Sequence, residues 1–117
     1  MDGRRSLGTA GERIAEAELA RSGLLTVARN ARTRWGEIDL VCRERTGYVF
    51  VEVKTRRAGS FVDAREAVDA RKSRRLARLA EAWLAGHGER GVAWRVMVAA
   101  VTVGVRGAAA VVLLDVT

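Results

Sequence analysis

The residues of this sequence best suited to chemistry are two acids and a lysine, Asp39, Glu52 and Lys54. Alternating apolar and polar residues predict strands over residues 37–43 and 48–54, and the four residues between them predict a hairpin loop. We expect this loop to close with Arg43 opposite Tyr48. Because residues two apart in a strand share a face, the apolar face of the first strand should carry Ile38, Leu40 and Cys42.

That register places the two acids face to face. Asp39 lies opposite Glu52, and Glu37 lies opposite Lys54, with the Cβ atoms of opposed residues about 4.5–5.5 Å apart. Two like charges at that separation are destabilising unless a cation lies between them, and Mg²⁺ or Mn²⁺ bound by carboxylate oxygens meets that need. Two simpler alternatives stay open. The acids could be exposed sheet residues balanced by nearby arginines, or Glu37 and Lys54 could form a cross-strand ion pair.

Lysine is rare in this chain, which makes its positions informative. Of 21 basic residues, 19 are arginine, and the two lysines are Lys54 and Lys72. Unlike arginine, a lysine beside a metal can lose its proton, and its compact ammonium can contact phosphate or water. Lys72 also falls on the apolar stripe of a predicted helix, with Val68, Leu76, Leu79 and Trp83. A snorkelling lysine at the edge of that stripe is the simpler alternative.

The composition predicts one small domain that attracts polyanions. The 117 residues fit a single domain spanning 1–117, and 49% hydrophobic with 30% charged residues argues against disorder. The net charge of +7 favours nucleic acid as the partner. A membrane surface is less favoured, because no basic amphipathic helix stands alone. The simpler alternative is that the excess of basic residues reflects compositional drift and indicates no polyanionic partner.

The sequence favours neither export nor a membrane span. The single cysteine, Cys42, cannot form an internal disulfide, and the first five residues lead into no apolar signal segment. The most apolar stretch, residues 92–114, is interrupted by Arg95 and Arg106, so it predicts two strands. We therefore expect a cytoplasmic protein.

The order of elements predicts an α/β fold. Thr9 and Glu12 have the spacing of a capping box, which predicts a helix from Ala10 to Arg21. That cap alone would explain Glu12, although this residue also heads an apolar stripe and could face the sheet. The other elements are three strands, a long helix and two strands, over residues 24–29, 37–43, 48–54, 63–84, 94–103 and 109–115.

Around the acids the sequence resembles a known family. Gly36-Glu37-Ile38-Asp39-Leu40, followed by Val51-Glu52-Val53-Lys54, resembles the D…ExK signature of the PD-(D/E)xK nuclease superfamily. With Gly11-Glu12, Asn30, Ala67-Val68, Lys72 and Arg75, the pattern is similar to the YraN family (UPF0102), which is related to archaeal Holliday-junction resolvases. The resemblance covers nearly the whole chain. It implies a restriction-endonuclease-like core with a mixed five-stranded sheet flanked by helices.

The resemblance also implies roles for single residues. Asp39 and Glu52 would be metal ligands, and the Val53 carbonyl would be a further ligand. Lys54 would position or activate the attacking water. Glu12 would complete the acidic cluster from the first helix.

Three further positions bear on that assignment. Glu37 is a candidate supporting acid outside the ligand set. Ile38 stands where the superfamily has proline, as in YraN-like sequences, and Met97 stands where the family has aspartate. The resemblance therefore implies no role for position 97 and leaves the core site unchanged.

Basic residues are predicted on two sides of these acids. One strip lies on the second predicted helix, at Arg71, Lys72, Arg74, Arg75 and Arg78, and a cluster near the ends of the hairpin strands comprises Arg32, Arg34, Arg56 and Arg57. Arginines arranged in this way can bind the phosphates of a nucleic-acid backbone. For the helix strip, the simpler alternative is an ordinary charged helix face that contacts only solvent. Trp35 could stack on a base or cover the sheet edge.

These features predict an Mg²⁺- or Mn²⁺-dependent endonuclease acting on DNA, including branched or junction DNA. RNA is an alternative substrate, and the chain could form a homodimer. No Ser/His/Asp or Cys/His set is available for covalent catalysis, because the sequence has one histidine. Two other functions stay open: a nucleic-acid-binding module that has lost the chemistry, and a protein-interaction domain with a basic face.

Overall fold

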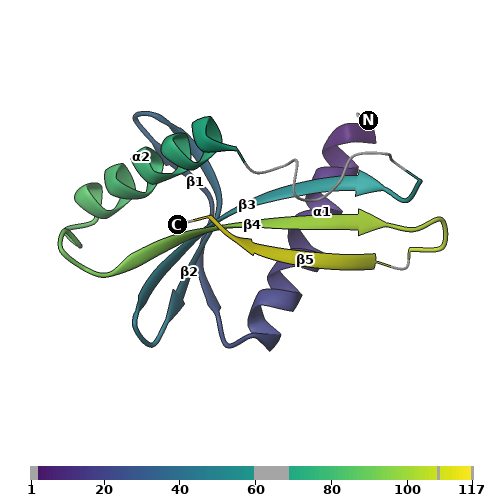
Figure 1. Cartoon of the computed structure of the whole chain (residues 1–117), viewed down its shortest axis with the longest axis horizontal. Helices are drawn as coiled ribbons and strands as arrows, with labels where there is room; N and C mark the ends of the chain where they lie inside the picture. Colours follow the sequence, from purple (N-terminus) through teal and green to yellow (C-terminus); the bar gives the residue numbers. More distant parts are fainter. Residues whose placement is uncertain (1–2, 60–68, 108, 117) are drawn as a thin grey trace.

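The computed structural model describes residues 3–59, 69–107 and 109–116, with side chains from residue 8 onward. Seven elements follow one another in these ranges (Figure 1). Two are helices, and five are strands of one sheet: α1 Gly3–Arg21, β1 Leu25–Thr33, β2 Gly36–Glu44, β3 Gly47–Arg57, α2 Ala70–Gly86, β4 Trp94–Val103 and β5 Ala109–Asp115. The predicted order of elements is confirmed.

The sheet is mixed, as predicted, with strand order β1-β2-β3-β4-β5. The pairs β1–β2, β2–β3 and β4–β5 are antiparallel, whereas β3–β4 is parallel. A parallel pair needs a long crossover, and α2 lies in the connection from β3 to β4. None of the helices in the described ranges has an apolar stretch long enough to cross a membrane.

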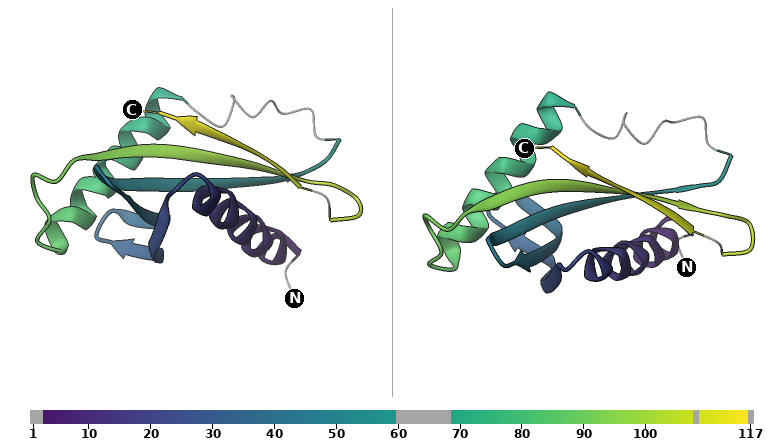
Figure 2. Two further views of the ribbon diagram at one scale, coloured as in Figure 1. Left: turned by 90° about the horizontal axis from the view of Figure 1, so that it is seen from below. Right: turned by 60° about the horizontal axis from the view of Figure 1, so that its bottom comes forward.

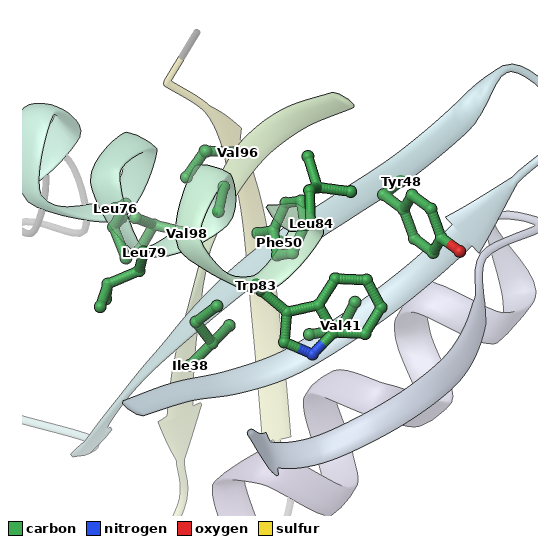
Figure 3. Packing of buried hydrophobic residues seen from close by; sticks show 11 residues of the cluster. Ile38, Val41, Tyr48, Phe50, Leu76, Leu79, Trp83, Leu84, Val96 and Val98 are labelled. Carbon is green, nitrogen blue, oxygen red and sulfur yellow. The ribbon is translucent and has the colours of Figure 1, made fainter. Parts of the chain in front are cut away.

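Two cores lie on opposite faces of the sheet, because successive residues of a strand point to opposite sides. Val49 and Val51 of β3 pack with Ala15 and Leu19 of α1. The alternate residue Phe50 packs in the α2 core, which includes Leu76, Leu79 and Trp83. Figure 3 shows this core, and Figure 2 shows α1 beneath the sheet.

Both helix starts differ from the predictions. α1 begins at Gly3, so Thr9 lies within the helix and is not its N-cap. The capping-box spacing of Thr9 and Glu12 does not mark a helix start here, because the helix already runs through both residues. The predicted helix from Asp63 is also wrong at its start: Asp69 has an extended backbone, and its side chain accepts the Lys72 N–H at 2.7 Å, which makes Asp69 the N-cap of α2. Residues 60–68, including Ala67 and Val68, lie outside the described residues.

The predicted register of the β2–β3 hairpin is confirmed, with Arg43 opposite Tyr48. Pairing continues one step further, to Glu44 opposite Gly47, so the turn consists of two residues and not four.

Gly11 sets the distance between α1 and β3. A Cβ atom at this position would lie 1.8 Å from the Thr55 Oγ1 atom and 2.8 Å from the Thr55 Cβ atom. The helix can approach the strand this closely only where a side chain is missing. This contact brings the next residue of α1, Glu12, to the sheet.

We predict that Gly11→Ala lowers the free energy of unfolding by about 1–3 kcal/mol, because the added methyl group overpacks the α1–β3 contact. Gly8→Ala is the matched control in the same helix, since a Cβ there meets nothing within 4 Å. It should raise stability by about 0.5–1 kcal/mol. Urea unfolding measures both variants. Equal effects of the two substitutions would contradict the role assigned to Gly11.

Candidate functional site

The candidate site lies where β2 and β3 separate. The last residue pair of their ladder is Leu40 opposite Val51. Beyond this pair, the Val53 N–H donates to the Asp39 Oδ2 atom at 2.8 Å. A side-chain oxygen of β2 thus replaces the backbone carbonyl that a continued ladder would provide. The predicted pairings of Asp39 with Glu52 and of Glu37 with Lys54 are therefore wrong. On its other edge β2 stays paired, with Glu37 opposite Arg32 of β1.

The alternation of β2 breaks at the same point. Ile38 and Val41 both belong to the α2 core, whereas Leu40 and Cys42 belong to the α1 core. Strict alternation would put residues 38 and 41 on opposite faces. The prediction that Ile38 shares a face with Leu40 and Cys42 is wrong, because the strand is irregular around Asp39.

Acids from α1 and β2 come together beside this irregularity. Burial is the main cause that raises the pKa of the Asp39 carboxyl, and the nearby carboxylates of Glu52 and Glu37 raise it further. The Val53 N–H and Lys54 offset part of that rise. Burial, followed by Asp39 and Glu37, also raises the pKa of Glu12. Glu12 thus faces the sheet acids, which was the alternative to the capping box.

A small cavity opens next to Glu12. Its volume is about 310 Å³, and Arg29, Asn30 and Leu40 are among the residues that line it. Asn30 has a φ of 48°, in the left-handed region where asparagine is tolerated better than most residues. The cavity leaves room beside Glu12 on the α1 side of the sheet.

Glu52 faces the other helix and is surrounded by cations. Its side chain is 13% exposed, and its Oε1 atom lies 2.7 Å from Arg75 Nη2 and 4.0 Å from Lys54 Nζ. Lys72 Nζ lies 3.3 Å from the Oε2 atom. Oε2 is nevertheless buried and accepts no hydrogen bond from the described residues, because the geometry of the lysine contact suits an ion pair only.

Lys72 and Arg75 belong to the predicted phosphate-binding strip, and their contact with Glu52 was not expected from the sequence. The signal was present in the placement of Lys72 on the buried stripe of α2, where Leu76, Leu79 and Trp83 are buried. A charged group on such a stripe needs a partner of opposite charge. The sequence does not place that partner, since it comes from β3.

Within the described residues, no group of three or more His, Cys, Asp or Glu side chains is arranged to hold a metal ion. Met97, at the position of the family aspartate, is buried in the α1 core and contributes no oxygen ligand. Asp39 contacts β3 at the separation of the strands through the Val53 N–H, and Glu52 is the residue before Val53 on β3.

The four arginines of the predicted basic strip are exposed on α2, as their spacing indicates, whereas Lys72 is half-buried against Glu52. Arg71 and Arg74 face solvent. Arg75 contacts Glu52, and the Arg78 guanidinium lies 5.5 Å from the centroid of the Trp35 ring. The α2 strip therefore continues from Glu52 to Trp35.

The predicted cluster of strand-end arginines is divided between two arms of the sheet. Arg34 lies 5.1 Å from the Trp35 ring centroid, in the turn between β1 and β2. Arg56 Nε donates to Thr102 Oγ1 at 3.3 Å, and Arg57 ends β3. Figure 1 shows the β1–β2 turn beside α2 and the end of β3 far from it.

A family model and two proteins of similar sequence carry the same family name. The model of the family described as "Uncharacterised protein family UPF0102" matches residues 11–103. A UPF0102 protein of Anaeromyxobacter dehalogenans is 47% identical over 88% of this chain and 77% of its own length. One of Streptomyces griseus is 48% identical over 75% of this chain and 74% of its own length.

A solved structure is also similar, at a lower level. Pyrococcus furiosus SfsA in complex with Ca²⁺ matches with a TM-score of 0.45 and 16% identity, over 97% of this chain and 64% of that chain. A similarity of this size carries no argument about function.

Proposed function

The chain belongs to the UPF0102 family, and we propose that it is a divalent-metal-dependent nuclease that hydrolyses phosphodiester bonds in DNA. The observation that carries the proposal is the placement of Asp39 and Glu52 where β2 and β3 separate. One carboxylate is fixed by the Val53 N–H, and the other lies beside Lys54.

The donor groups fit a hard cation. Mg²⁺ is bound in proteins by as few as one or two carboxylates, and it keeps further positions for water and substrate phosphate. The buried Glu52 Oε2 atom lacks a hydrogen bond from the described residues, and burial disfavours ionisation of Asp39. Asp39, Glu52 and the Val53 carbonyl would hold the ion, with Glu12 and Glu37 adding negative charge nearby. When bound, Mg²⁺ or Mn²⁺ would polarise the phosphoryl group and stabilise the charge that develops on it.

The protein's own residues would orient the reaction. The Val53 N–H fixes the Asp39 carboxylate, and Lys72 with Arg75 fixes that of Glu52. The Lys54 side chain is 51% exposed, so its ammonium can reach solvent and position an attacking water.

DNA as the substrate is supported by charge. The net charge is +7, and the exposed arginines of α2 lie next to Glu52. Guanidinium groups on such a face bind the phosphate backbone and fix its position without reading the sequence. RNA offers the same phosphates, so substrate panels should include it.

The first test is cleavage of branched, single-stranded and duplex DNA with Mn²⁺. Asp39→Asn and Glu52→Gln should each abolish cleavage and leave DNA binding intact or stronger, because they remove a ligand and also repulsion from phosphate. Lys54→Arg should be nearly as damaging as Lys54→Ala, since arginine keeps the charge but changes its shape and cannot release a proton.

Glu18→Gln is the control, a carboxylate near the end of α1 that pairs with Arg21 and contributes to neither the candidate site nor the α2 strip. It should cleave like the wild type. Cleavage by both Asp39→Asn and Glu52→Gln at the wild-type rate would refute the assigned site.

The second test concerns the α2 strip and does not need catalysis. Arg71 and Arg74 are exposed, whereas Arg75 already contacts Glu52, so the first two should be changed together. Each phosphate contact adds about −0.9 to the slope of log affinity against log salt on duplex DNA. Arg71→Ala with Arg74→Ala should therefore flatten this slope by about two units.

The matched control replaces two exposed arginines in turns away from α2, Arg45 and Arg106, and so removes the same charge. Binding titrations between low and physiological salt measure both double variants. If the two variants flatten the slope equally, net charge and not the α2 strip governs binding.

A second function is favoured by specific observations. Glu52 is already neutralised by Lys72 and Arg75, and Met97 occupies the position of the family aspartate. Both features suit a DNA-binding module without catalysis. Such a module would bind DNA with the α2 strip and cleave no member of the substrate panel.

A further inference from the structure

Trp35 lies on the surface in a turn that is closed by hydrogen bonds of the Thr33 side chain. Its indole is 55% exposed and belongs to neither core. In the turn between β1 and β2, the Thr33 Oγ1 atom accepts the Trp35 N–H at 3.1 Å and donates to the Gly36 carbonyl at 2.8 Å. The alternative of a ring that covers the sheet edge does not fit this exposure.

Two arginines already approach the ring. The guanidinium carbon of Arg34 lies 5.1 Å from its centroid, and that of Arg78 lies 5.5 Å away. Both distances are within the range of cation–π contacts. Since the ring keeps more than half of its exposure, these contacts leave ring surface on which a flat group can stack.

A pocket opens beside the ring between the turn and the end of α2. Its volume is about 690 Å³, and Trp94 and Arg90 also line it. Three arginines, at positions 34, 78 and 90, face one acid, Glu81. The lining thus combines an aromatic surface with positive charge. The ligand class that matches both is an aromatic base attached to phosphate.

The pocket is connected to the candidate site along α2. Arg75 contacts Glu52, and Arg78 contacts Trp35. Residues three apart on a helix are neighbours, with Cβ atoms about 5–6 Å apart. A strand bound along these arginines would pass from Glu52 to Trp35.

We infer that the Trp35 pocket binds an unpaired nucleotide, with its base stacked on the indole and its phosphate held by Arg34, Arg78 or Arg90. A base in a duplex has no free face to offer, so the preferred substrate has a single-stranded segment next to the cleaved bond. The substrate preference rests on the proposed nuclease function, whereas the pocket itself does not.

The test measures affinity by fluorescence anisotropy in EDTA, so that cleavage plays no part. The probes are oligothymidylate, a blunt duplex, and the same duplex with an oligothymidylate overhang. Trp35→Ala should weaken binding of oligothymidylate and of the overhang by about 5-fold to 140-fold, the range for one base–aromatic stack. Binding of the blunt duplex should change by less than about twofold.

Two variants control for folding and for lost apolar surface. Trp35→Phe keeps an aromatic ring and should retain most of the affinity. Leu25→Ala removes another exposed apolar side chain, 70% exposed on β1, and should have no effect.

Two results would overturn the inference. Equal losses on the blunt duplex and the overhang would mean that the pocket binds only phosphate. Unchanged affinity would mean that Trp35 only packs on Arg34 and Arg78. If the overhang contrast holds but the wild type cleaves nothing, the nuclease proposal fails and the pocket stands. If cleavage depends on Asp39 but Trp35→Ala weakens binding of the overhang no more than that of the blunt duplex, the pocket inference fails and the nuclease proposal stands.

Discussion

The hydrogen bond from the Val53 N–H to the Asp39 Oδ2 atom is the contact on which the site depends. A buried backbone N–H without a partner costs about 1–3 kcal/mol, so a strand that leaves its neighbour needs a replacement acceptor. Asp39 supplies it from a side chain. β2 can then depart toward α2 while β3 continues beside β4. Asp39 lies where the strands part, and Glu52 precedes Val53 on β3.

Charge is distributed unevenly around this point. On the α1 side, burial and mutual repulsion raise the pKa of Asp39 and of Glu12, so ionising these carboxyls is costly. On the α2 side, Lys72 and Arg75 compensate Glu52. The protein thus neutralises the Glu52 carboxylate with its own cations, whereas the Val53 N–H and Lys54 compensate Asp39 only in part. A bound cation would relieve the repulsion that remains.

Local patterns predicted most of the fold. Alternating and apolar stretches located all five strands, and the register of the β2–β3 hairpin followed from its short loop. The end of that ladder was not predictable, because the Asp39 side chain takes the Val53 N–H in place of a backbone carbonyl. The partner of Lys72 was missed for a related reason: a helix stripe shows that a residue is buried, but not which strand faces it. Asp69 and Thr9 are both plausible caps by type, and only one of them begins a helix.

The central claim is that Asp39 and Glu52 together bind a divalent cation. Calorimetric titration of Mn²⁺ into the wild type, Asp39→Asn and Glu52→Gln tests it most directly, with Glu18→Gln as the control. We predict saturable binding to the wild type and to the control, and affinity at least about tenfold weaker in each site variant, a loss of about 1.4 kcal/mol or more. Wild-type affinity in both site variants, or no saturable binding to the wild type, would contradict the claim.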